Sequence, residues 1–109
     1  MPLPDPKSHR ISLDEAIAQA RRFREALNRG DLFSRKEKGG LFLRKEVDEL
    51  LAQPGCAGLR FYYGRNAAGG DTVILVGADA NGNDMTKGVV LEDHFLCPPF
   101  CGDASPLNA

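Results

Sequence analysis

The sequence predicts an α+β fold in which two helices pack on a small antiparallel sheet of about three strands, followed by an irregular C-terminal tail. Three observations support this prediction. Apolar residues recur at helical spacing over residues 13–29. The runs 59–63 and 72–76 have the composition of strands and are joined by a glycine-rich loop. Three prolines after residue 97 exclude a regular helix or a central strand at the C-terminal end.

Length and composition limit the classes of protein that the chain can belong to. At 109 residues it is large enough for one hydrophobic core, and its net charge of −1 gives no field that would attract nucleic acid or an anionic membrane. No apolar run approaches the roughly 20 residues that a membrane-spanning helix needs. The first twelve residues lack the charged-then-apolar order of a secretory signal. We therefore expect a cytoplasmic protein that binds neither nucleic acid nor a membrane.

The sequence divides into an extended N-terminal arm (1–10), a single α+β domain (11–96) and a tail containing proline and cysteine (97–109). The arm has three prolines among its first six residues and no apolar periodicity, so we expect it to be ordered only by packing on the domain.

The first helix is predicted over residues 13–29. Ser12 is a good N-cap residue, Glu15 stands three positions later as a capping box requires, and Gly30 occupies the place of a C-cap glycine. The polar stretch 31–40 is typical of a connection between elements.

A second, shorter helix is predicted over residues 44–53, where Pro54 and Gly55 end it. The apolar residues 41–43 before it are expected to form a brief strand or to anchor this helix.

The two central strands differ in their patterns. In the first, Leu59, Phe61 and Tyr63 alternate with Arg60 and Tyr62, which predicts that the former set faces the core and the latter faces outward. The second, residues 72–76 (TVILV), is apolar on both faces and is therefore expected to be central.

A sheet this small cannot bury both faces of TVILV behind one helical layer, so we expect the tail or a second subunit to cover the other face. A turn is predicted at Asn81-Gly82, and a third strand over residues 88–92.

Three cysteines and a histidine are the residues with the most distinctive chemistry. His94, Cys97 and Cys101 form H-x2-C-x3-C, and Cys56 would complete a Cys3His set of the kind that zinc favours. A Cys97–Cys101 disulfide is a second interpretation, although Cys97 precedes a proline and so favours an extended backbone over the required turn. In the third interpretation the cysteines are small buried apolar residues, which is the default for Cys56. Apart from this zinc, no cofactor is expected.

The chain contains three runs of interest, LLAQPGCAGLRFYYG, VILVGADANGND and CPPFCG. We relate them to the motifs PGC-x-GLR, V-x-VG-x-D-x-x-G-x-D and C-P-P-[aromatic]-C. Their order resembles a group of short uncharacterised bacterial proteins over roughly residues 41–109. The resemblance implies a bacterial, cytosolic setting and a single architecture that contains both PGC and CPPFC. It implies no activity and no site residues.

These patterns favour a small non-enzymatic binding or accessory protein that acts through protein–protein contacts with a protein partner or as a homodimer. The candidate binding residues are Arg60, Tyr62 and Phe100. The alternative is a metal-binding or redox-responsive domain that uses Cys56, His94, Cys97 and Cys101. A cysteine-dependent enzyme is a third class, but no group that would orient a Cys–His pair can be named, so no catalytic residue is assigned.

Overall fold

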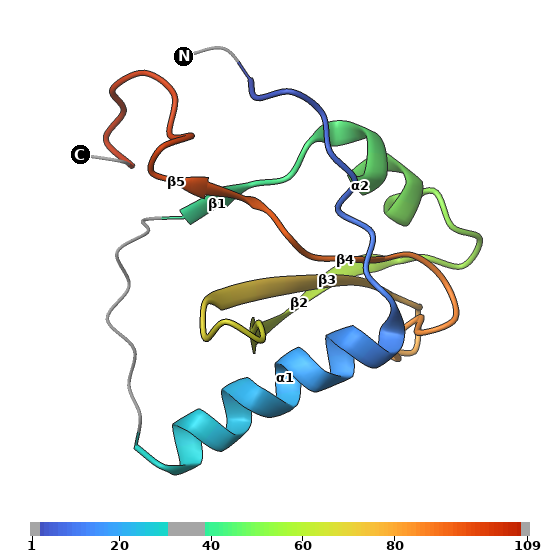
Figure 1. The fold of residues 1–109 in the computed structure, drawn as a ribbon. Helices are drawn as coiled ribbons and strands as arrows, with labels where there is room; N and C mark the ends of the chain where they lie inside the picture. Colours follow the sequence, from blue (N-terminus) through green and yellow to red (C-terminus); the bar gives the residue numbers. More distant parts are fainter. Residues whose placement is uncertain (1–2, 31–38, 108–109) are drawn as a thin grey trace.

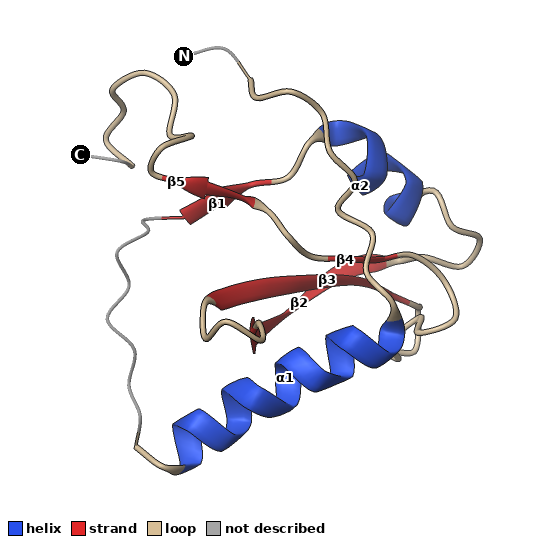
Figure 2. Cartoon of the chain, viewed as in Figure 1, coloured by secondary structure: helices blue, strands red, loops and turns tan. Residues whose placement is uncertain are grey.

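The computed structural model describes residues 3–30 and 39–107. The elements follow in the order α1 (Leu13–Asn28), β1 (Gly39–Leu41), α2 (Arg44–Leu51), β2 (Gly58–Arg65), β3 (Asp71–Ala78), β4 (Val90–Leu91) and β5 (Phe95–Cys97). Strands β2, β3 and β4 form one antiparallel sheet with β3 in the middle, while β1 and β5 form a separate two-stranded ribbon (Figures 1 and 2). The predicted α+β class, with two helices and an antiparallel meander, is confirmed. Within the described residues, neither helix is long and apolar enough to cross a membrane.

Helix α1 forms where its local signals place it. The Ser12 hydroxyl accepts a hydrogen bond from the Glu15 backbone N–H at 3.1 Å, which satisfies one of the donors left open at a helix start. After the helix, Gly30 has φ +70°, a left-handed conformation that ends helices and that glycine adopts without steric cost. The predicted first helix is therefore confirmed to within one residue.

Strand β3 is buried on both faces, as its sequence predicts. On one face Ile74 and Val76 pack with Ala16 of α1, and on the other Leu75 packs with Leu50 of α2 and with Leu91. Figure 1 shows the two helices on opposite sides of the sheet. The prediction that the tail or a second subunit covers the second face is wrong, because α2 and the residues around it supply that cover.

The prediction that Leu59, Phe61 and Tyr63 of β2 face the core is wrong. Leu59, Phe61 and Tyr63 are 46%, 58% and 45% exposed, although the alternation assigned them to the core. They share a face with Leu75 on the neighbouring strand β3, and on this face α2 packs on β3 and β4. Arg60 and Tyr62 lie on the opposite face, where α1 packs.

The N-terminal arm contributes a residue to the interior. Ile11 donates a backbone hydrogen bond to Val90 (3.0 Å) and Glu92 donates one to His9 (2.7 Å), so the arm runs alongside β4. The His9 side chain is fully buried. Its Nε2 accepts from the Leu43 backbone N–H (3.1 Å), and its Nδ1 lies 3.0 Å from the Asp93 carbonyl oxygen. Since Nε2 is an acceptor, this network assigns the proton to Nδ1, which donates to Asp93.

The turn predicted at Asn81-Gly82 is confirmed: the Asp79 carboxylate accepts from the backbone N–H groups of Asn81 (3.0 Å) and Asn83 (2.9 Å), and Gly82 has φ +83°. The predicted connection over 31–40 falls mostly on residues 31–38, which lie outside the described residues. Its last two residues, Gly39 and Gly40, belong to β1 and pair with Cys97 and Leu96.

Replacement of Leu50 by alanine tests whether α2 is the cover of β3. The Leu50 side chain is fully buried, and its truncation leaves a cavity against Leu75 and Leu91, so we expect a loss of about 2–5 kcal/mol in the free energy of unfolding. Leu51→Ala is the matched control, because Leu51 is 47% exposed on the same helix and should lose less than about 1 kcal/mol. Urea unfolding measures both. Equal losses would contradict the packing of α2 described above.

Candidate functional site

At the outer edge of β2, alternate residues point their backbone N–H and C=O groups away from the sheet. Within the described residues β2 is the terminal strand, so no strand pairs with this edge. Asn66 donates its backbone N–H to the Gly70 carbonyl (2.8 Å), which makes these two residues a hydrogen-bonded pair. Hydrogen-bonded and non-hydrogen-bonded pairs alternate along an antiparallel ladder. Tyr62 therefore directs its backbone groups toward β3, while Phe61 and the alternate residues on either side direct theirs outward.

The residues whose backbone faces outward also carry the exposed apolar side chains. We call Leu59, Phe61 and Tyr63 the aromatic edge. The rings of Phe61 and Tyr63 meet edge-on with centroids 5.7 Å apart, and the Tyr63 ring lies 5.5 Å from that of Phe23 in α1. The aromatic edge thus combines large exposed side chains with backbone groups that point away from β3.

The opposite face of β2 holds a cluster of polar side chains centred on Asp84. Arg60 Nη1 donates to the Asp84 carboxylate at 2.7 Å and to the Gly82 carbonyl at 2.8 Å. The Tyr62 hydroxyl donates to the other Asp84 oxygen at 2.5 Å. Two of the three predicted binding residues, Arg60 and Tyr62, are therefore brought together, and the carboxylate that joins them comes from the loop after β3.

The electrostatics of this cluster follow from its hydrogen bonds. Burial alone would raise the pKa of Asp84, but the hydrogen bonds from Tyr62 and Arg60, with the charge of Arg60, outweigh it and hold that pKa below its ordinary value. The hydrogen bond to Asp84, aided by burial, raises the pKa of Tyr62. The cluster therefore holds an ionised carboxylate and a neutral phenol at neutral pH.

A groove of about 290 Å³ lies between α1 and this face of the sheet. Its walls are mainly apolar side chains from α1, β3 and β4, and its polar members are Arg24, Tyr62, Asp84 and Thr86. This volume is at or below the lower limit of about 300 Å³ that is usual for small-molecule sites.

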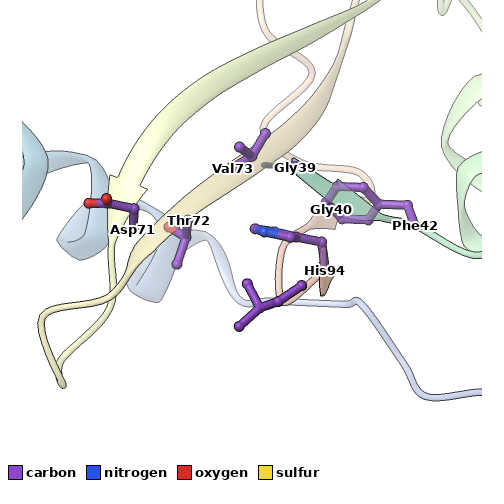
Figure 3. A pocket seen from close by; sticks show the side chains of 8 residues that line it. Gly39, Gly40, Phe42, Asp71, Thr72, Val73 and His94 are labelled. Atoms are coloured by element: carbon purple, nitrogen blue, oxygen red, sulfur yellow. The ribbon is translucent and has the colours of Figure 1, made fainter. Parts of the chain in front are cut away.

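A second, smaller cavity of about 180 Å³ surrounds His94. Figure 3 shows the His94 ring projecting toward Thr72, with Phe42 beyond its other end. A Cβ atom on Gly40 would lie 1.9 Å from His94 Cδ2, so this ring position requires glycine at residue 40. This volume is below the 300–1,000 Å³ that is usual for ligand pockets.

The four residues predicted to bind metal or to act in redox chemistry are not gathered into one site. Cys56 has a free thiol, donates to the Gly58 carbonyl (3.3 Å) and packs beside Leu50 and Leu75. Cys97 and Cys101 form a disulfide, and His94 lines the separate cavity described above. Across residues 3–30 and 39–107, no three His, Cys, Asp or Glu side chains are placed to hold a metal ion.

The expectation that Pro98 disfavours the Cys97–Cys101 disulfide is wrong. The Cα atoms of the two cysteines are 4.7 Å apart, within the range that a disulfide needs. The Cys97–Pro98 and Pro98–Pro99 peptide bonds are both cis.

The third predicted binding residue, Phe100, lies on another element. Its ring packs edge-on against Phe95 of β5, with centroids 5.3 Å apart. The sequence prediction also missed Asp84 and the aromatic edge. The sequence signal for that edge is the run FYY at residues 61–63, which places large aromatic rings on both faces of a strand, so that covering one face with a helix leaves the other uncovered.

The comparisons with protein-family models, with curated proteins and with solved structures gave no match to this chain. Its function is therefore inferred from its own geometry.

Asp84→Asn tests the polar cluster through pH. The lowered pKa means that ionised Asp84 stabilises the fold fully above the ordinary carboxyl pKa, and that this stabilisation is lost as pH falls through the lowered value. We expect the variant to lose about 1–2 kcal/mol at neutral pH, and the difference from the wild type to shrink in acid. Urea unfolding at several pH values measures both.

Asp48→Asn is the control for this substitution. Asp48 pairs with Arg44 on the exposed face of α2, so its replacement should change stability by no more than about 0.5 kcal/mol. A loss in Asp84→Asn that does not vary with pH would show that the carboxylate is not held by these hydrogen bonds.

Proposed function

We propose that this protein is a small non-enzymatic binding or accessory protein that acts through protein–protein contacts, and that the aromatic edge of β2 is its contact surface. The observation that carries the proposal is the coincidence of three exposed large apolar side chains with an outward-facing strand edge. A strand added to such an edge gains backbone hydrogen bonds, and its side chains gain apolar contacts.

The lack of protection at this edge supports the same proposal. Soluble proteins usually block a terminal strand with charged side chains, proline or a bulge. Between Gly58 and Gly64 the only charged residue is Arg60, and Asp84 on the α1 face holds its guanidinium. An exposed apolar strand is advantageous to a protein when a partner covers it.

Site-specific photo-crosslinking tests this proposal. A photoreactive phenylalanine analogue in place of Phe61 should give covalent protein adducts when the full chain is irradiated in expressing cells. The same analogue at Leu107, which is 95% exposed in the tail, is the control and should give few. Mass spectrometry of the adducts identifies the partner. Equal yields at the two positions, or none at residue 61, would refute the aromatic edge as a contact surface.

The Cys97–Cys101 disulfide favours a second function, that of a redox-responsive domain. The bond closes a short loop that contains Phe100, whose ring packs on Phe95. A dithiol reductant would donate two electrons and two protons, become oxidised to its own disulfide, and leave two free cysteine thiols on an opened tail. Structural disulfides are rare in the cytosol. In the cytoplasmic, bacterial setting that we propose for the protein, we therefore expect this disulfide to be reversible. Zinc binding by the same cysteines would require the disulfide to be reduced first.

A thiol count tests the disulfide. In denaturant without reductant we expect one reactive thiol, that of Cys56, because only this cysteine is free. After reduction and removal of the reductant, all of Cys56, Cys97 and Cys101 should react. A colorimetric thiol reagent gives both values, and protein prepared under non-oxidising conditions is the control. Three reactive thiols before reduction in oxidised protein would exclude the disulfide and this second function.

A further inference from the structure

We propose that the groove between α1 and the three-stranded sheet binds a small amphipathic carboxylate, that is, a short aliphatic chain with one anionic end. Figure 1 shows α1 lying along this face of the sheet. The groove is on the face of β2 opposite to the aromatic edge, so this inference goes beyond the proposed function and does not depend on it.

The apolar part of the groove has a buried floor and a partly open wall. Ile74, Val76 and Val90 of the sheet form the floor and are almost fully buried. Leu13 and Ile17 belong to the wall on α1, and they keep 38% and 44% of their surface exposed. A hydrocarbon chain in the groove would remove this apolar surface from water, and such burial stabilises a complex in proportion to the area covered.

Arg24 supplies a cationic group in the same wall. It follows Leu13, Ile17 and Ala20 along one face of α1, at the spacing of successive helical turns. At a rise of about 1.5 Å per residue, Arg24 is about 10 Å along the helix axis from Ile17. The ion pairs found among the described residues do not include Arg24. Its guanidinium is therefore placed to bind the charged end of a ligand whose chain lies along α1.

The carboxylate that lines the groove, Asp84, is already neutralised within its own chain. Arg60 donates to one of its oxygens at 2.7 Å and Tyr62 donates to the other at 2.5 Å. The Arg60–Asp84 pair has no net charge, so the positive charge of Arg24 is the net charge of the described groove walls. Complementarity of charge thus favours an anionic ligand. A carboxylate carries the single negative charge that balances one guanidinium, which binds it with two parallel hydrogen bonds.

The volume of the groove sets the size of the ligand. A water molecule takes about 30 Å³ in the liquid, so the groove volume of about 290 Å³ is the space of about ten waters. A ligand of about ten non-hydrogen atoms, the size of octanoate, fills such a space. At the binding efficiency usual for small ligands, we expect a dissociation constant of about 1 mM for octanoate.

Titration of the oxidised full chain with octanoate, followed in methyl NMR spectra, tests the site. Octanoate should shift the methyl signals of Leu13, Ile17 and Ile74, and it should leave those of Leu107 in the exposed tail unchanged. Octanol and octylammonium carry the same chain with a neutral or a cationic end. Each should bind at least about fivefold more weakly, because neither can pair with a guanidinium.

Substitutions on α1 separate the charge from the apolar groove. Arg24→Gln should weaken octanoate binding about five- to tenfold and leave octanol binding unchanged, since it removes the guanidinium alone. Arg21→Gln is the matched control, because Arg21 is exposed on the same helix but does not line the groove, and it should change octanoate binding by less than about twofold. Ala20→Leu fills the groove and should abolish binding of both ligands. Thermal unfolding checks that each variant folds.

The titrations can overturn the proposal in distinct ways. If octanoate at about 10 mM shifts no methyl signal of the groove, the site is excluded. If octanol binds as tightly as octanoate, or Arg24→Gln binds octanoate like the wild type, the guanidinium does not recognise an anion. Tighter binding of octylammonium would make Asp84 the polar end of the site instead of Arg24. These outcomes leave the crosslinking test at residue 61 unaffected, so failure here and failure of the proposed function are distinguishable.

Discussion

Strand β3 can persist in this chain only if both of its faces are kept from water, because its residues from Thr72 to Val76 offer no polar face. Burying a large aliphatic side chain contributes about 1.5–3 kcal/mol, so several such residues are a large share of the stability of a small domain. Helix α1 supplies one cover through Ala16, and α2 supplies the other through Leu50. Helix α2 has eight residues and packs on β3 and β4. Because the two helices are placed to cover β3, the face of β2 that carries Phe61 stays exposed.

The hydrogen bonds of Asp84 hold the charged side chain of the edge strand β2. Arg60 is the residue that would ordinarily give this edge a solvated charge that keeps other chains away. Asp84 instead holds its guanidinium on the α1 face, and the Tyr62 hydroxyl completes the same carboxylate. Asp84 thus pairs with the single charged residue between Gly58 and Gly64. The aromatic edge and the polar cluster therefore lie on opposite faces of the same strand.

The sequence predicted those parts of the fold whose signals are local. Helix α1 has a capping serine, helical spacing and a terminal glycine within one short stretch, and β3 carries apolar residues on both faces over consecutive positions. The β1–β5 ribbon could not be predicted, because Gly39 and Gly40 have no strand preference and their partners are more than 50 residues away. The faces of β2 were assigned wrongly because both faces carry large apolar rings, so the alternation does not say which face a helix covers. The partner of Arg60 and Tyr62 lies more than 20 residues later, and no spacing rule connects them.

The position of His9 has a consequence for how the chain acquires its structure. Its imidazole is held by Leu43 on one side and by Asp93 on the other, so a single buried ring joins the beginning, the middle and the end of the chain. During synthesis, His9 leaves the ribosome long before Asp93 has been made. This interior contact must therefore form after most of the polypeptide has emerged, and contacts between such distant residues slow folding, since a long loop has to close first. Until then the N-terminal segment lacks its hydrogen bonds to Val90, Glu92 and Asp93, so a binding factor or protease would find it more accessible than in the finished fold.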